Sequence, residues 1–295
     1  MTGPAFALLA AVALAASTVF LRRGLIRGHV YVGVFMSLII GIPAFSVLAY
    51  ISGEFEYVTK FQLETVLILG AAGLIHVVGG RTFLYKSIQI IGSNKASPIV
   101  STNIVIAIIL GTTILSEPLT NKIIISGLIL FVGVILVSRG EIHSNTEKYS
   151  SYVKGAIFAF LTAIIFSATP LMVRIGILQT GAPILCGLVS YVFAIIIFTS
   201  LLFSPNIRTS LTSTDKNSMI YFVVAAVIVT LGKLFEYLAL ELIGVTTVVP
   251  LMGSASLFVI GFSYIFNRRI ENFGPLLILG VILVVLGINA SFFLE

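Results

Sequence analysis

Ten long apolar runs constrain the fold of this chain more than any other feature. Each run has about the 20 residues that a helix needs to cross the hydrocarbon core of a bilayer. They cover residues 4–21, 30–51, 65–91, 97–115, 121–138, 153–173, 183–203, 218–240, 245–266 and 274–293. Hydrophobic residues make up 58% of the 295 residues and charged residues only 9%, against roughly 25% in soluble domains. The sequence therefore predicts an all-α polytopic membrane protein with ten transmembrane helices.

The chain also repeats itself at a constant offset of 152 residues. The run Gly-Arg-Thr-Phe-Leu-Tyr at 80–85 returns at 232–237 as Gly-Lys-Leu-Phe-Glu-Tyr. Each half holds five spans, and an odd number of crossings starts the second half on the opposite side of the membrane. We therefore predict two inverted five-helix repeats, an arrangement typical of secondary transporters. The first repeat covers residues 1–140, the linker 141–152 and the second repeat 153–295.

The distribution of Lys and Arg predicts the orientation in the membrane. Apart from two basic residues inside spans, twelve lie after spans one, three, five, seven and nine, and three lie on the opposite side. The twelve are Arg22, Arg23, Arg27, Lys86, Lys95, Arg139, Lys148, Lys154, Arg208, Lys216, Arg268 and Arg269. Basic loops face the cytoplasm, so we expect a multi-pass plasma membrane protein with both termini outside the cytoplasm. The net charge of +6 then belongs to these loops and indicates no nucleic-acid partner.

Two further motifs are similar to those of a known family. Small residues lead into spans four and nine, as Ala-Ser-Pro-Ile at 96–99 and Val-Val-Pro-Leu at 248–251. A Ser-Glu-Pro-Leu-Thr turn at 116–120 precedes a glycine-bearing run at 127–133, and the second half keeps a trace of the turn at 268–272. With the five-plus-five layout, these motifs make the chain resemble a ten-helix, EamA-type member of the drug/metabolite transporter (DMT) superfamily. The resemblance implies a proton-, potential- or exchange-driven metabolite carrier whose cavity is lined by spans other than five and ten.

Arg81 and Lys233 are the two basic residues inside apolar spans, where a charge costs about 2.5–3.5 kcal/mol on insertion scales. At 1.5 Å per residue, each lies roughly 15 Å from its helix end, near the middle of the bilayer core. Because the repeats are inverted, we predict that both residues face one central cavity. The alternative for Arg81 is that its long side chain snorkels toward Lys86 and the membrane interface.

The neighbours of these cations indicate the substrate class. Glu236 and Tyr237 follow Lys233 at i+3 and i+4, so they share its helix face. The Lys–Glu pair is either a structural pair or a proton site. Arg81 has Tyr85 at i+4 and no acid within a turn, which leaves the site with a net charge of +1. Arginine suits carboxylate and phosphate groups through its planar fork of donors, so we expect an anionic substrate.

Other polar residues inside the spans are weaker candidates. His76 lies five residues before Arg81, off its helix face at 3.6 residues per turn, and a packing role is favoured over a proton relay. The prolines that open spans four and nine, Pro98 and Pro250, are expected in the first helical turn rather than at a helix break. The candidate substrate-binding residues are Arg81, Lys233, Tyr85, Tyr237, Asn103 and Ser254, and the candidate proton-coupling residues are Glu236 and His76.

The sequence therefore predicts a secondary transporter that moves a small organic metabolite (an amino acid, a carboxylate or a phosphate-bearing compound) by alternating access around a midplane cavity. Its expected partners are that solute and the lipid bilayer, and we expect a monomer or weak homodimer. The alternatives are a flippase for lipids or lipid-linked headgroups, or a multidrug or cation exporter of the same fold. No spacing of His, Cys and acidic residues suggests a metal site, a cofactor or an enzyme.

Overall fold

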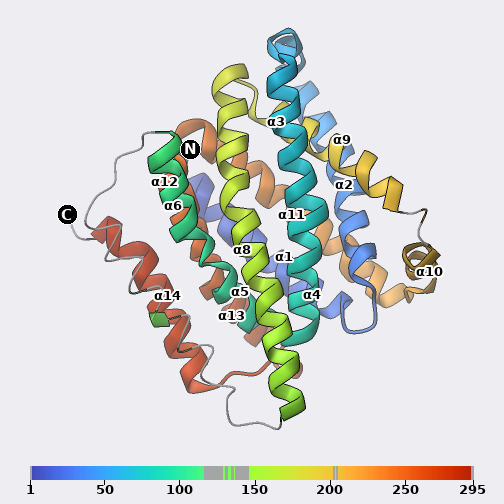
Figure 1. Cartoon of the computed structure of the whole chain (residues 1–295), viewed down its shortest axis with the longest axis vertical. Coiled ribbons are helices and arrows are strands. Elements are labelled where there is room, and N and C mark those ends of the chain that lie inside the picture. Colours follow the sequence, from blue (N-terminus) through green and yellow to red (C-terminus); the bar gives the residue numbers. More distant parts are fainter. Residues whose placement is uncertain are drawn as a thin grey trace.

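The computed structural model describes residues 2–115, 129, 132–133, 136, 146–201, 203 and 205–293, and its regular elements are all helices (Figure 1). In the first half these are α1 (Gly3–Gly24), α2 (Val30–Ile51), η1 (Glu54–Lys60), α3 (Leu63–Gly73), η2 (Leu74–Gly80), α4 (Arg81–Ile91), α5 (Ser93–Val100) and α6 (Asn103–Ile114). In the second half they are α8 (Thr146–Thr180), α9 (Pro183–Leu201), α10 (Pro205–Ser213), α11 (Lys216–Leu242), α12 (Val245–Gly253), α13 (Ala255–Phe266) and α14 (Pro275–Phe293).

Eight stretches of the described residues are long and apolar enough to cross a membrane. They are α1, α2, α3 to α4, α5 to α6, α8, α9, α11 and α12 to α13, and they match eight of the predicted spans to within a few residues at most ends. The predicted tenth span corresponds to α14, of which the described side chains form the apolar stretch Pro275–Leu286. The predicted fifth span, 121–138, lies almost wholly outside the described residues. The described residues therefore contain eight candidate membrane spans, at the positions of eight of the ten predicted ones.

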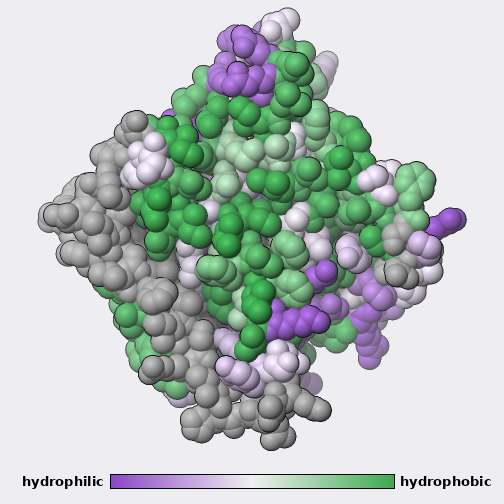
Figure 2. Space-filling model, in the orientation of Figure 1, coloured by the Kyte–Doolittle hydropathy of each residue, from purple (hydrophilic) through white to green (hydrophobic). Residues whose placement is uncertain are grey.

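The outer surface of the bundle suits a lipid environment. Figure 2 shows apolar side chains spread over much of one face, with hydrophilic patches at its upper tip and toward its lower right. Exposed residues such as Val47, Leu67, Ile109 and Ile196 come from four different spans. In water such a surface would be unstable, whereas in a bilayer these side chains face acyl chains.

Helix packing follows the sequence repeat. The first span of each repeat packs on the third span of the other: α1 contacts α11, and α8 contacts α4. The second spans, α2 and α9, contact each other, and each also contacts the third span of the opposite repeat. The contacts are therefore preserved when the two halves are exchanged, and the fold consists of two repeats.

Two arginines at equivalent positions of the two repeats make equivalent hydrogen bonds. Arg22 donates from Nη1 to the carbonyl oxygens of Ile88 and Gln89, at 2.9 and 3.0 Å. Arg174 lies 152 residues later and donates from Nη1 to the carbonyl oxygens of Leu240 and Glu241. All of these acceptors lie in the last turn of a third span, where carbonyl groups lack partners within the helix; the Ile88 carbonyl also accepts from the N–H of Gly92, which follows the helix. Each repeat therefore uses one arginine to cap the same helix end.

Spans four and nine are each interrupted along their length, and their prolines do not open the helices as predicted. Pro98 and Pro250 lie inside α5 and α12, because these helices begin at Ser93 and Val245. A proline inside a helix has no N–H to donate, so the bonding pattern breaks around it. The helix stops just beyond each proline and restarts with α6 and α13, and α5 contacts α13 while α6 contacts α12. The two interrupted spans therefore cross each other in opposite directions.

The early start of α5 has a local cause that the sequence pattern did not reveal. Gly92 adopts φ +85° and separates α4 from α5. The carboxylate of Glu271 then accepts hydrogen bonds from the backbone N–H groups of Ser93, at 2.8 Å, and Asn94, at 3.4 Å. Such a carboxylate caps a helix N-terminus. Because this cap comes from the loop after α13, proline spacing alone could not predict it.

Candidate functional site

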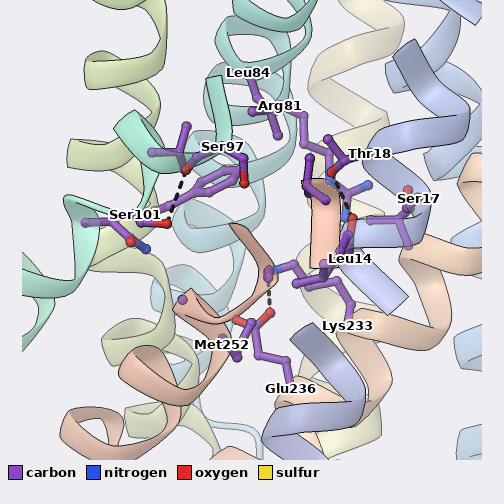
Figure 3. A pocket seen from close by; sticks show the side chains of 18 of the residues that line it. Leu14, Ser17, Thr18, Arg81, Leu84, Ser97, Ser101, Lys233, Glu236 and Met252 are labelled. Atoms are coloured by element: carbon purple, nitrogen blue, oxygen red, sulfur yellow. Dashed lines mark hydrogen bonds and ion pairs between the residues drawn. The ribbon is translucent and has the colours of Figure 1, made fainter. Parts of the chain in front are cut away.

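A cavity of about 150 Å³ lies at the crossing of the interrupted spans (Figure 3). Residues of α1, η2, α4, α5 and α6 line it from the first repeat, and residues of α8, α11, α12 and α13 from the second. Most lining residues are apolar. The polar and charged ones are Ser17, Thr18, His76, Arg81, Tyr85, Ser97, Ser101, Asn103, Lys233 and Glu236. Apolar walls with a few convergent polar groups are typical of small-molecule sites.

Arg81 borders this cavity and is almost fully buried, with 2% of its surface exposed. Its Nη1 donates to the hydroxyl of Ser37 at 2.7 Å, and its Nη2 donates to the hydroxyl of Tyr191. The guanidinium carbon also lies 5.2 Å from the centre of the Tyr191 ring. These contacts hold the side chain inside the bundle, which excludes the snorkelling alternative. Among the described residues, its side-chain hydrogen bonds go to hydroxyl groups and none goes to a carboxylate.

Lys233 borders the same cavity, and it has a counterion. Its Nζ donates to the Glu236 carboxylate at 2.7 Å, and both side chains are buried. Figure 3 shows this pair across the cavity from Arg81. The two basic residues and the single acid leave a formal charge of +1 among the charged lining residues of the described chain. The positive charge without a carboxylate partner is therefore that of Arg81.

His76 also lines the cavity, which corrects the prediction that it lies off the Arg81 face. The reason is η2, a π-helical segment in which the N–H of Arg81 bonds to the carbonyl of His76, five residues back. This wider turn brings His76 and Arg81 onto one face, whereas 3.6 residues per turn would separate them. The imidazole stacks on Phe166, with ring centres 4.3 Å apart and an angle of 19°. Its Nδ1 is buried without a hydrogen-bond partner in the described part of the chain.

The remaining sequence candidates divide into two groups. Tyr85 and Asn103 line the cavity. Tyr237 packs its ring 5.9 Å from that of Phe45 and does not line it. Ser254 donates to the carbonyl of Leu251 at 2.6 Å, at the interruption of span nine, and also lies outside the lining. The structure therefore brings six of the eight predicted site residues to one cavity.

Sequence reasoning missed the residues that hold Arg81. Ser37 and Tyr191 belong to α2 and α9, and neither lines the cavity itself. It also missed the contact between Ser101 and Ser256, whose hydroxyl oxygens lie 2.7 Å apart where the interrupted spans cross. These are polar residues within apolar spans, which is the signal that identifies them in the sequence.

A second, outer cavity of about 420 Å³ lies near the end of α4. Leu21 and Ile88 border the central cavity, whereas Arg22 and Ile90 border the outer one. At this boundary Arg22 Nε donates to the Glu271 carboxylate at 3.1 Å. Arg22 comes from the first repeat and Glu271 from the second. One ion pair between the repeats therefore lies where the two cavities adjoin.

Comparison with known proteins identifies the family. The sequence profile of the EamA-like transporter family matches residues 1–139 and 153–293. No curated protein matches the sequence. A solved structure described as "Crystal structure of protein" has a TM-score of 0.71 and 13% identity, over 99% of this chain and 97% of that chain, a likeness that shows the fold alone. The predicted family is confirmed: the chain belongs to the EamA-like transporter family and is a membrane transporter of the DMT type.

Proposed function

We propose that this transporter carries a small organic anion, with a carboxylate or phosphate group, by alternating access around the central cavity. The observation that supports this proposal is the state of Arg81, a buried guanidinium on the cavity whose partners in the described structure are hydroxyl groups. The other cation on the cavity, Lys233, has its own carboxylate partner. A substrate anion would supply the counterion that Arg81 lacks.

The hydrogen-bonding capacity of Arg81 supports the same substrate class. A guanidinium has five N–H donors in a planar fork, and Ser37 and Tyr191 use two of them. The remaining donors suit a carboxylate or phosphate, which arginine binds with two parallel hydrogen bonds. A cationic solute would instead meet the charge of +1 at short range in a medium of low dielectric constant. The cation exporter is therefore the weaker alternative.

The size of the cavity also bears on the alternatives. An apolar cavity of about 150 Å³ accommodates a molecule of the size of benzene, and the central cavity has about this volume. This supports a solute with a few carbon atoms over a lipid headgroup.

Substitution of Arg81 tests the proposal. With purified protein in liposomes, we expect Arg81→Ala to lower uptake of labelled lactate or phosphate by about 10- to 100-fold, because a hydrogen bond to a charged group contributes about 1.5–3 kcal/mol. Arg81→Lys should restore only part of this loss, since an ammonium cannot form the paired contact. The matched control is Arg268→Ala, because Arg268 is exposed in a loop and stacks on Tyr264. Unchanged uptake through Arg81→Ala, in a variant that keeps its unfolding midpoint, would contradict the proposal.

A further inference from the structure

We infer that His76 is a second substrate-contacting residue, whose Nδ1 hydrogen-bonds a hydroxyl group on the anion that Arg81 binds. The inference rests on the proposed function and narrows the substrate class to small hydroxylated anions. It joins two observations, an unpartnered ring nitrogen and its position beside Arg81 on the cavity.

The first observation is the unpartnered nitrogen. His76 is 95% buried, with 5% of its surface exposed, and its Nδ1 has no hydrogen-bond partner within the described residues. Buried polar atoms nearly always have a partner, so each exception requires an explanation. Ser87 also has an unpartnered buried atom, but it does not line the central cavity. Of these two residues, only His76 borders the cavity, so a solute there can approach its ring.

The second observation is the fixed geometry of the imidazole. The π-turn places His76 one turn before Arg81, with the Arg81 N–H bonded to the His76 carbonyl. Both residues border the cavity, so one solute can contact both side chains. The stack on Phe166 restricts rotation of the ring. A site that is preorganised in this way loses little entropy when it binds a ligand.

The chemistry of the site favours a hydroxyl group over an amino group. A hydroxyl group donates and accepts, so it pairs with Nδ1 in either tautomer of the ring. An ammonium group only donates, and in the cavity it would lie in the space that the Arg81 guanidinium borders, where like charges repel each other. Lys233 Nζ lies 6.0 Å from the centre of the Phe166 ring on which His76 stacks, which adds positive charge on that side. A 2-hydroxy acid therefore fits the pair better than the matching amino acid.

Three probes with one carbon skeleton test the inference: propionate, lactate and L-alanine. Their dissociation constants come from the ligand-induced shift of the unfolding midpoint of the full chain in detergent, which grows with ligand concentration over Kd. For the unmodified protein we expect lactate to bind about 3- to 10-fold more tightly than propionate, the gain of one hydrogen bond. L-Alanine should bind no more tightly than propionate.

The variant His76→Phe keeps an aromatic ring to stack on Phe166 but removes the nitrogen. We expect it to bind propionate as the unmodified protein does and to lose the preference for lactate. His76→Asn, whose side-chain amide lies near the former Nδ1, should restore part of the preference and provides a second variant if His76→Phe does not fold. Ser87→Ala is the matched control and should keep the full preference, because Ser87 lies outside the cavity lining.

The outcomes separate this inference from the proposed function. A preference for lactate that persists in His76→Phe, equal binding of lactate and propionate, or a preference for L-alanine would overturn the assignment of His76 while anion binding stands. If neither these probes nor inorganic phosphate stabilises the unmodified protein at any concentration, the proposed function and the inference fail together.

Discussion

The buried pair Lys233–Glu236 differs from Arg81 in how its charge is balanced. Its two partners lie one turn apart on α11, and their side chains are 6% and 3% exposed. Taking two charges out of water is unfavourable, and the attraction between them compensates only while both are present. Arg81, by contrast, is held by neutral hydroxyls, which leaves its charge available to a ligand. In the function proposed above, Lys233 and Glu236 would shape the site and Arg81 would attract the solute.

This difference predicts the effect of removing one member of the pair. Glu236→Gln leaves Lys233 buried without a counterion, so we expect the free energy of unfolding to fall by about 3–5 kcal/mol. The double variant Lys233→Met with Glu236→Met should recover most of this loss, and unfolding in detergent measures both effects. The sequence left open whether this pair is a proton site or a structural pair, and the pH dependence of transport by Glu236→Gln decides between them. Loss of the pH dependence indicates a proton site, and an unchanged pH dependence indicates a structural pair.

At the level of single residues, the sequence predicted the buried cations and the partners that lie within one helical turn of them. It did not predict the partners that lie far away along the chain. Lys233 and Glu236 lie three residues apart, so helical spacing was sufficient. The partners of Arg81 lie 44 and 110 residues away along the chain. Their pairing depends on how α2 and α9 pack, which a pattern within one segment does not contain. His76 was misplaced because its helix is π-helical where the periodicity assumed an α-helix.

The element that fixes the cavity wall is the third span of the first repeat, where η2 and α4 lie against α8. Glycine makes this close approach possible. A Cβ on Gly80 would lie 2.5 Å from Cε1 of Phe166, the ring on which His76 stacks. Its neighbour Gly79 has more room, because a Cβ there would first meet Ile165 at 3.6 Å. The two glycines therefore provide a matched pair of sites one residue apart.

We expect Gly80→Ala to lower the free energy of unfolding by about 1–3 kcal/mol, because the added methyl displaces Phe166 from a packed position. Anion affinity should fall in the same variant, since Phe166 borders the cavity. Gly79→Ala should be neutral or slightly stabilising, as alanine favours the helix. Unfolding midpoints with and without lactate measure both effects. Equal behaviour of the two variants would contradict the packing argument.

For the molecule as a whole, the offset of 152 residues correctly predicted that two repeats pack as equivalents, down to the arginine caps on α4 and α11. The ten-helix count rests partly on residues 121–138, which lie mostly outside the described chain. The position of Pro98 inside α5 was missed because Glu271 caps the start of α5 from the other repeat. Inter-repeat contacts of this kind arise only when both halves are folded.

The ion pair Arg22–Glu271 ties the repeats together at the boundary of the two cavities, on the face predicted to be cytoplasmic. We expect Glu271→Gln to weaken this contact and to raise the labelling rate of a cysteine at Thr18, a lining residue, by a thiol reagent added from that face. All of the labelled proteins also carry Cys186→Ser, which removes the one cysteine of the sequence. The control Glu56→Gln changes an exposed acid outside the spans. A labelling rate that is the same in both variants would exclude a barrier at this ion pair.

The crossing of the interrupted spans has a mechanical consequence. Because α5 contacts α13 and α6 contacts α12, the two interrupted spans cross beside the cavity. In the alternating access that we propose, one repeat would tilt against the other about this crossing, so that the gap widens at one membrane face while it narrows at the other. A carrier that works in this way would release its cargo one molecule at a time and would not conduct a continuous stream of ions.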